Sequence, residues 1–142
     1  MKKFFKNLFK ILILFIIGGG IYIGIELLYR GYTHWTMFIL GGLCFVVIGL
    51  LNEKLCWETP LITQSLIGTA IITFLEYITG YIVNIKLGWN IWDYSNMLFN
   101  INGQVCLIFS FVWFFIAAVA IVIDDYLRYW IFGEEKPHYS II

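Results

Sequence analysis

Charged residues are scarce in this chain of 142 residues. Lys, Arg, Asp and Glu together make up 13% of it, the formal net charge is zero, and 61% of the residues are hydrophobic. Soluble domains carry about 25% charged residues and about 45–50% apolar ones. The composition therefore argues against a separate soluble domain, predicts an integral membrane protein, and gives no reason to expect a nucleic-acid partner.

Several catalytic signatures are also absent from the sequence. It contains no Gly-rich loop ending in Lys-Ser or Lys-Thr, no G-x-S-x-G and no His-Glu-x-x-His. The chain therefore cannot bind and hydrolyse ATP by the P-loop route, and it carries no hydrolase motif. We expect no cofactor and no catalytic residues, and an intramembrane acid/base enzyme is the least favoured interpretation.

The three cysteines, Cys44, Cys56 and Cys106, follow no functional pattern. Their number is odd, they form no C-x-x-C pair, and two of them lie inside apolar runs. Zinc sites and disulfide frameworks require paired or clustered cysteines. We therefore predict packing residues and no metal site.

Long apolar runs predict an all-α, polytopic membrane protein. A spanning helix needs about 20 mostly apolar residues, and we place spans at residues 11–29, 36–51, 61–85 and 104–123 of a single transmembrane domain, 1–142. These helices would form a four-helix transmembrane bundle with a re-entrant or interfacial external loop between spans three and four. Residues 124–142 would form a cytoplasmic tail.

The first apolar run begins after a basic stretch, which is also typical of a secretory signal peptide. Gly18-Gly19-Gly20 is not an Ala-x-Ala cleavage site, and the apolar pattern continues to Tyr29. A retained first span is therefore favoured over a cleaved signal. The three glycines either loosen this helix or allow a neighbouring helix to approach closely.

The distribution of Lys and Arg predicts the orientation in the cell membrane. With four spans, both termini lie on one side, and that side collects seven of the nine basic residues, whereas the other side has Arg30 and Lys86. Positive charge concentrates on the cytoplasmic side of membrane proteins. Both termini are therefore expected in the cytoplasm, and the loop after span three outside. The seven residues are Lys2, Lys3, Lys6, Lys10, Lys54, Arg128 and Lys136.

Two glutamates fall within predicted spans. Glu26 lies roughly 24 Å along span one and Glu76 roughly 22 Å along span three, both counted from the cytoplasmic side. Ionisable residues at membrane depth are costly and usually face a bundle interior or a water-filled cavity. With Arg30, His34 and Asp93 near the same level, these side chains are predicted to converge on one polar cluster in the outer leaflet.

Each member of the cluster also has a purely structural interpretation. Glu26 and Arg30 can form only an i,i+4 ion pair, and Glu76 can bond to Arg30 or to a tyrosine and thereby lock the bundle. His34 can be an interfacial histidine, and Asp93 can bond nearby backbone N–H groups in a turn. Since Asn52-Glu53 ends a span on the cytoplasmic side, we interpret it as a solvated helix end.

The stretch from Lys86 to Ser110 is the most distinctive part of the sequence. Residues 87–102 are too apolar for a solvated loop, and tryptophan favours the headgroup level of a membrane. We predict that residues 87–102 fold back as a lid over Glu26, Arg30 and Glu76, with Asp93 as its innermost polar group. An amphipathic segment beside the bundle is the alternative. The full set of predicted ligand-binding or structural residues is Glu26, Arg30, His34, Glu76, Trp92, Asp93, Tyr94 and Asn102.

Short motifs along the chain form a family pattern. They are Glu26 with Tyr29-Arg30-Gly31, Thr33-His34-Trp35 with Met37, Gly41-Gly42, Asn52-Glu53, Thr73-x-x-Glu76 with Gly80, Trp92-Asp93-Tyr94-Ser95, Asn102-Gly103-Gln104 and Trp113. In these residues the chain resembles the small four-span membrane family called Putative ABC-transporter type IV, or CmpB-like, over about residues 20–130. The resemblance implies a transporter component. Asn96-Met97-Leu98 departs from the proline expected after Ser95.

Taken together, these patterns favour a transport-related protein. It would be a permease-like subunit whose outer-leaflet polar cluster binds a small polar ligand or a lipid headgroup. The alternative is an accessory protein that binds lipid or a partner helix. The expected partners are membrane lipids, a second copy of the chain, or a membrane or ATPase subunit.

Overall fold

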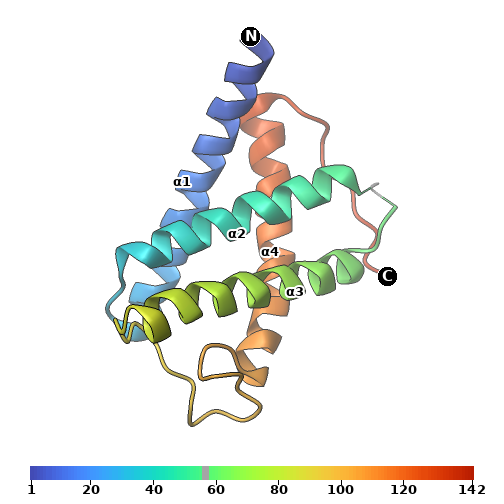
Figure 1. Cartoon of the computed structure of the whole chain (residues 1–142). Helices are drawn as coiled ribbons and strands as arrows, with labels where there is room; N and C mark the ends of the chain where they lie inside the picture. The colour runs from blue at the N-terminus through green and yellow to red at the C-terminus, as the bar shows by residue number, and fades with distance from the viewer. Residues whose placement is uncertain (56–57) are drawn as a thin grey trace. The chain divides into compact units, whose positions relative to one another are not determined.

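The computed structural model of the chain describes residues 1–55 and 58–142, and at Asn52 the backbone alone. Its helices are α1 (Lys2–Arg30), α2 (Trp35–Lys54), α3 (Leu61–Gly80) with its π-helical continuation η1 (Tyr81–Lys86), and α4 (Leu107–Phe132) (Figure 1). Within the described residues there is no β-strand, only an isolated bridge between Ile101 and Val105. The predicted all-α fold class is confirmed.

Three of the described helices are long and apolar enough to cross a membrane. They are α1, α3 with η1, and α4, whereas the apolar part of α2, Trp35–Leu51, is shorter. The helix predicted over residues 104–123 differs most, because α4 begins at Leu107 and continues to Phe132. We placed the end of the span at Ile123, with a cytoplasmic tail after it. In the structure Asp124 and Arg128 are buried and pair with each other, and the helix continues past them.

The chain divides into two compact units. The first unit comprises Met1–Cys56 with Ala120–His138, and the second comprises Trp57–Val119 with Tyr139–Ile142. The first unit therefore contains α1, α2 and the C-terminal part of α4. The second contains α3, η1, the segment 87–106 and the N-terminal part of α4.

Glycines bring α1 and α2 together in the first unit. A Cβ on Gly18 would lie 2.3 Å from Cβ of Phe45, and a Cβ on Gly42 would lie 2.7 Å from the carbonyl oxygen of Phe15. Only residues without a side chain permit this separation of the two backbones. Of the two roles predicted for the glycines of α1, Gly18 therefore serves the close approach of a neighbouring helix.

The second unit is closed at one end by the C-terminus. The backbone N–H of Leu61 donates to the carbonyl of Ser140 at 2.8 Å, and that of Ile62 donates to Ile141 at 3.3 Å. The first N–H groups of a helix have no partner inside the helix. The last residues of the chain therefore cap the N-terminus of α3.

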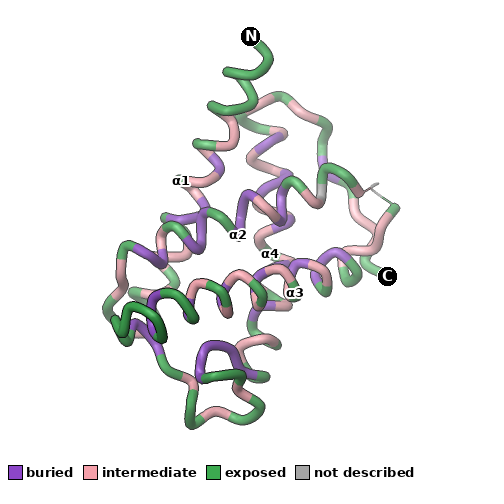
Figure 2. The backbone as a smooth tube through the Cα atoms, viewed as in Figure 1, coloured by how far each residue is buried: buried purple, intermediate pink, exposed green. Residues whose placement is uncertain are grey.

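Exposed residues recur along every helix (Figure 2). Many are large and apolar, including Phe74, Phe111 and Phe115, each more than 60% exposed. Such a surface is unfavourable in water and suits acyl chains. Cys44 and Cys106 are buried thiols outside any disulfide, in keeping with packing residues, and Cys56 lies outside the described residues.

Candidate functional site

The carboxyl group of Glu76 is the centre of a polar cluster in the second unit. Glu76 is 2% exposed on α3, and its two oxygens have different partners. Oε1 accepts from the Tyr94 hydroxyl at 3.3 Å, and Oε2 accepts from the Trp113 Nε1–H at 2.8 Å. The segment 87–106 and α4 therefore each direct one donor at a single acidic group on an apolar helix.

The segment 87–106 is held against α3 and η1 by side-chain amides. Asn84 on η1 accepts from the backbone N–H of Ile91 at 2.7 Å and donates to Oε1 of Gln104 at 2.8 Å. The indole N–H of buried Trp92 donates to the carbonyl of Gln104 at 3.0 Å. Irregular backbone at membrane depth needs such internal partners, so these bonds explain how the segment folds back on the helix that precedes it.

Two glycines, Gly80 and Gly103, allow the close packing of the segment 87–106. A Cβ on Gly80 would lie 2.5 Å from Oε1 of Gln104 and 2.9 Å from the Trp92 ring. Gly103 has a φ of +73°, and a Cβ there would lie 2.8 Å from both Asp93 and Ser95 side-chain oxygens. A left-handed backbone angle suits glycine, so Gly103 meets a steric and a conformational requirement together.

Asp93 lies on the outside of this segment, so its prediction as the innermost polar group is wrong. Its carboxylate is exposed and accepts from both the backbone N–H and the hydroxyl of Ser95. These two hydrogen bonds hold the pKa of the Asp93 carboxyl below its ordinary value. The buried polar side chain of this segment is instead that of Gln104, 4% exposed, which accepts from Asn84 of η1.

Glu26, Arg30 and His34 belong to the first unit. Arg30 Nε donates to Glu26 Oε2 at 2.8 Å, and the guanidinium lies 4.7 Å from the centroid of the Tyr32 ring. His34 caps α2, with its Nδ1 3.3 Å from the backbone N of Thr36 and 2.8 Å from the Thr36 hydroxyl. The predicted i,i+4 ion pair is confirmed, and His34 has a local structural role.

The eight predicted residues thus fall into two groups. The second unit holds Glu76 on α3 together with four residues of the segment 87–106, namely Trp92, Asp93, Tyr94 and Asn102. Asn102 donates to the Tyr77 hydroxyl at 2.8 Å. The first unit holds the group of Glu26, Arg30 and His34. Their convergence on one ligand remains a prediction.

Trp113, Asn84 and Gln104 were not named as site residues from the sequence. Trp113 and Gln104 lay within the family motifs, but an indole or amide in an apolar run is most simply explained by packing. Asn84 carried a signal that was overlooked: it is an uncharged polar residue about two helical turns beyond Glu76 on the same predicted span.

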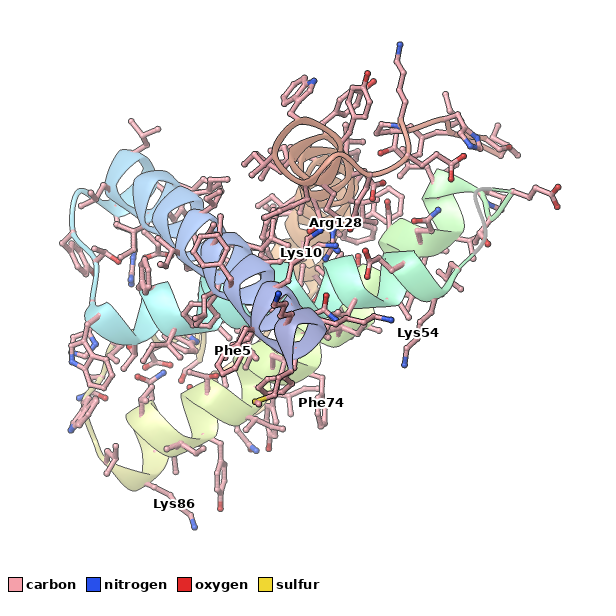
Figure 3. All side chains as sticks on the ribbon, turned by 90° about the horizontal axis from the view of Figure 1, so that it is seen from above. Phe5, Lys10, Lys54, Phe74, Lys86 and Arg128 are labelled. Atoms are coloured by element: carbon pink, nitrogen blue, oxygen red, sulfur yellow. The ribbon has the colours of Figure 1, made fainter. Side chains whose placement is uncertain are left out.

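A second polar cluster, in the first unit, also escaped the sequence analysis. Arg128, 3% exposed, binds Asp124 at 2.8 Å and also pairs with Glu53. Lys10 pairs with Glu53 at 3.5 Å and also with Glu134, and Figure 3 labels Lys10 and Arg128 at this cluster. Glu53 is therefore an exposed helix end, as expected, but it is also tied to charges from other segments of the unit, which the sequence did not predict.

The chemistry available at the cluster in the second unit is that of a fixed carboxyl group. Its neighbours Tyr94 and Trp113 donate through a phenol and an indole, which orient the carboxyl group. Such a group can bind a cationic or hydrogen-bonding part of a ligand. Within the described residues, no three His, Cys, Asp or Glu side chains lie together as a set that could hold a metal ion.

The chain matches a protein family over most of its length. The family model described as Putative ABC-transporter type IV matches residues 12–135. Neither the curated proteins nor the solved structures give a match.

Proposed function

Because this chain belongs to the Putative ABC-transporter type IV family, we propose that it is a permease-like membrane subunit whose Glu76 cluster receives a small polar ligand or a lipid headgroup. The family and the apolar helices make it a multi-pass, transport-related membrane protein. The ligand site and the subunit role are the finer part of the proposal.

The observation that carries the proposal is the buried carboxyl group of Glu76 on a helix able to span a membrane. Ionisable side chains inside such helices are rare, and they mark substrate or ion pathways more often than structural positions. Here the helix carries the acid, while the segment 87–106 and α4 supply Tyr94 and Trp113 to hold it in one orientation. Because α3, α4 and the segment 87–106 all contribute to this site, its geometry changes when one of them moves.

A permease-like role requires an energy source from outside this chain. The sequence lacks the Gly-rich phosphate-binding loop, so hydrolysis of ATP by that route would fall to a partner subunit. We therefore propose an assembly of this chain with a P-loop ATPase, or with further copies of itself and that ATPase, in the cell membrane.

The test is purification of the tagged chain from native membranes into lipid nanodiscs, followed by mass spectrometry and an ATPase assay. We expect a P-loop ATPase at fixed stoichiometry, with hydrolysis that depends on this chain. Glu76→Gln should preserve assembly and lower the rate of hydrolysis.

The matched control is Glu58→Gln, because Glu58 is an exposed glutamate outside the helices. Glu53 is unsuitable as a control, since it pairs with Arg128. A stable assembly without any nucleotide-hydrolysing subunit would contradict the proposed role. Equal rates for Glu76→Gln and Glu58→Gln would contradict the proposed site.

A further inference from the structure

We propose that the outer surface of the second unit holds a single anionic phospholipid, at a site separate from the Glu76 cluster. The site is a pocket of about 390 Å³ between α3 and the segment 87–106. Its lining residues are Ala70, Thr73, Phe74, Tyr77, Ile101 and Val105.

The walls of this pocket suit an acyl chain. They are almost wholly apolar, and Phe74 and Ile101 at its edges are 62% and 57% exposed. The lining residues of α3 run from Ala70 to Tyr77, which is about 10 Å of helix. An acyl chain lying along this groove would pack against shaped protein walls, which is the main attraction available between apolar groups within a membrane.

Two of the lining residues, Thr73 and Tyr77, carry hydroxyl groups beside the apolar walls. Thr73 Oγ1 is buried and has no hydrogen-bond partner among the described residues. The Tyr77 hydroxyl accepts from Asn102 at 2.8 Å, which leaves its own proton to donate. A buried hydroxyl without a partner keeps an unused donor, and the ester carbonyls of a phospholipid are acceptors for it.

A cation lies beyond the end of the pocket. Lys86 Nζ lies 5.7 Å from the centroid of the Tyr81 ring, and the Tyr81 ring lies 6.4 Å from the Tyr77 ring. The Tyr77 ring of the pocket is thus followed by the Tyr81 ring and then by the Lys86 ammonium group at the end of η1. Figure 3 labels Lys86 there, with Phe74 further back along α3. This charge selects a phosphate, and an anionic headgroup over a zwitterionic one.

The test is native mass spectrometry of the full chain, delipidated in detergent and titrated with phosphatidylglycerol or with phosphatidylcholine of identical acyl chains. We expect one retained lipid, with phosphatidylglycerol preferred by about fivefold, since one lysine near an anionic lipid contributes about that factor. Lys86→Gln should remove the preference. Lys54→Gln, on an exposed lysine of α2, should leave it unchanged.

Ala70→Phe should fill the groove and abolish the retention of a single lipid. Val119→Phe adds similar bulk at an exposed position of α4 and should not alter retention. If Ala70→Phe does not fold, Thr73→Val removes the unpartnered hydroxyl without adding volume and should weaken retention of both lipids. Equal retention of the two lipids by the wild-type chain overturns the proposal, as does unchanged retention in Ala70→Phe or Thr73→Val.

Discussion

Glu76 and Asp93 differ in how far their side chains are buried. Glu76 is 2% exposed and Asp93 is exposed, although both are acidic residues near the same end of the second unit. The sequence predicted that Glu76 would avoid lipid and that a tyrosine was one of its possible partners, and both points are confirmed. It misplaced Asp93, because composition indicates polarity and does not indicate which side of a turn a side chain occupies.

Substitutions of Glu76 should lower the free energy of unfolding, and the decrease should be larger for the substitution that removes more of its hydrogen bonds. Glu76→Leu leaves the Tyr94 hydroxyl and the Trp113 indole without their acceptor, at about 1–3 kcal/mol for each buried donor that finds no other. Glu76→Gln keeps one acceptor oxygen and should fall between Leu and wild type. Denaturant unfolding in detergent micelles measures both. A leucine variant as stable as wild type would show that these bonds contribute nothing to stability.

Asp93 should stabilise its turn at all but strongly acidic pH. Its pKa is lowered by the Ser95 hydroxyl and amide, so its contribution is present above the ordinary pKa and is lost as the pH falls through the lowered one. Hydrogen exchange in lipid nanodiscs should show a protected Ser95 amide in the wild type at neutral and mildly acidic pH.

Asp93→Ala should remove that protection, and Asp93→Asn should keep part of it, because its amide oxygen still accepts. Amides from Trp92 to Asn102 should also lose protection in the alanine variant, since the turn orients the rest of the segment. Free exchange of these amides in the wild-type protein would contradict the anchored segment.

At the scale of the helix, the positions of the elements were predictable, whereas the C-terminal end of α4 was not. Apolar runs located all four helices, because the hydropathy of a segment requires only its own residues. The end of α4 depends on partners: Arg128 meets Asp124 within the helix and Glu53 from α2. Such long-range pairing cannot be read from local charge, and the cluster in the first unit was missed for the same reason.

Two glycines of α1 should respond to alanine in opposite ways. Gly18→Ala places a Cβ 2.3 Å from Phe45 of α2 and should destabilise by about 1–3 kcal/mol, the usual cost of overpacking. A Cβ on Gly20 would meet no neighbouring segment within 4 Å in the part of the chain that the structure describes, so Gly20→Ala should stabilise by up to about 1 kcal/mol through helix propensity. Unfolding followed by circular dichroism in micelles compares them. Equal shifts would contradict the close approach of α1 and α2.

For the whole molecule, the remaining prediction is orientation. Both termini should face the cytoplasm, because seven of nine basic residues lie on that side of the predicted spans. Asn96→Cys, in the segment between α3 and α4, should react with an impermeant thiol reagent added to intact cells, and Lys136→Cys should react only after the cells are opened. The reverse labelling pattern would show that both termini lie outside the cell and would contradict the prediction.

The capping of α3 by Ser140 and Ile141 has a consequence for biosynthesis. The ribosome releases the start of α3 before it adds Ser140 and Ile141, so the first turn of that helix stays uncapped until then. Its N–H groups gain their acceptors only after these two residues have been made. A chain that stalls or is cut between α3 and Ser140 therefore keeps uncapped N–H groups at the start of a membrane helix.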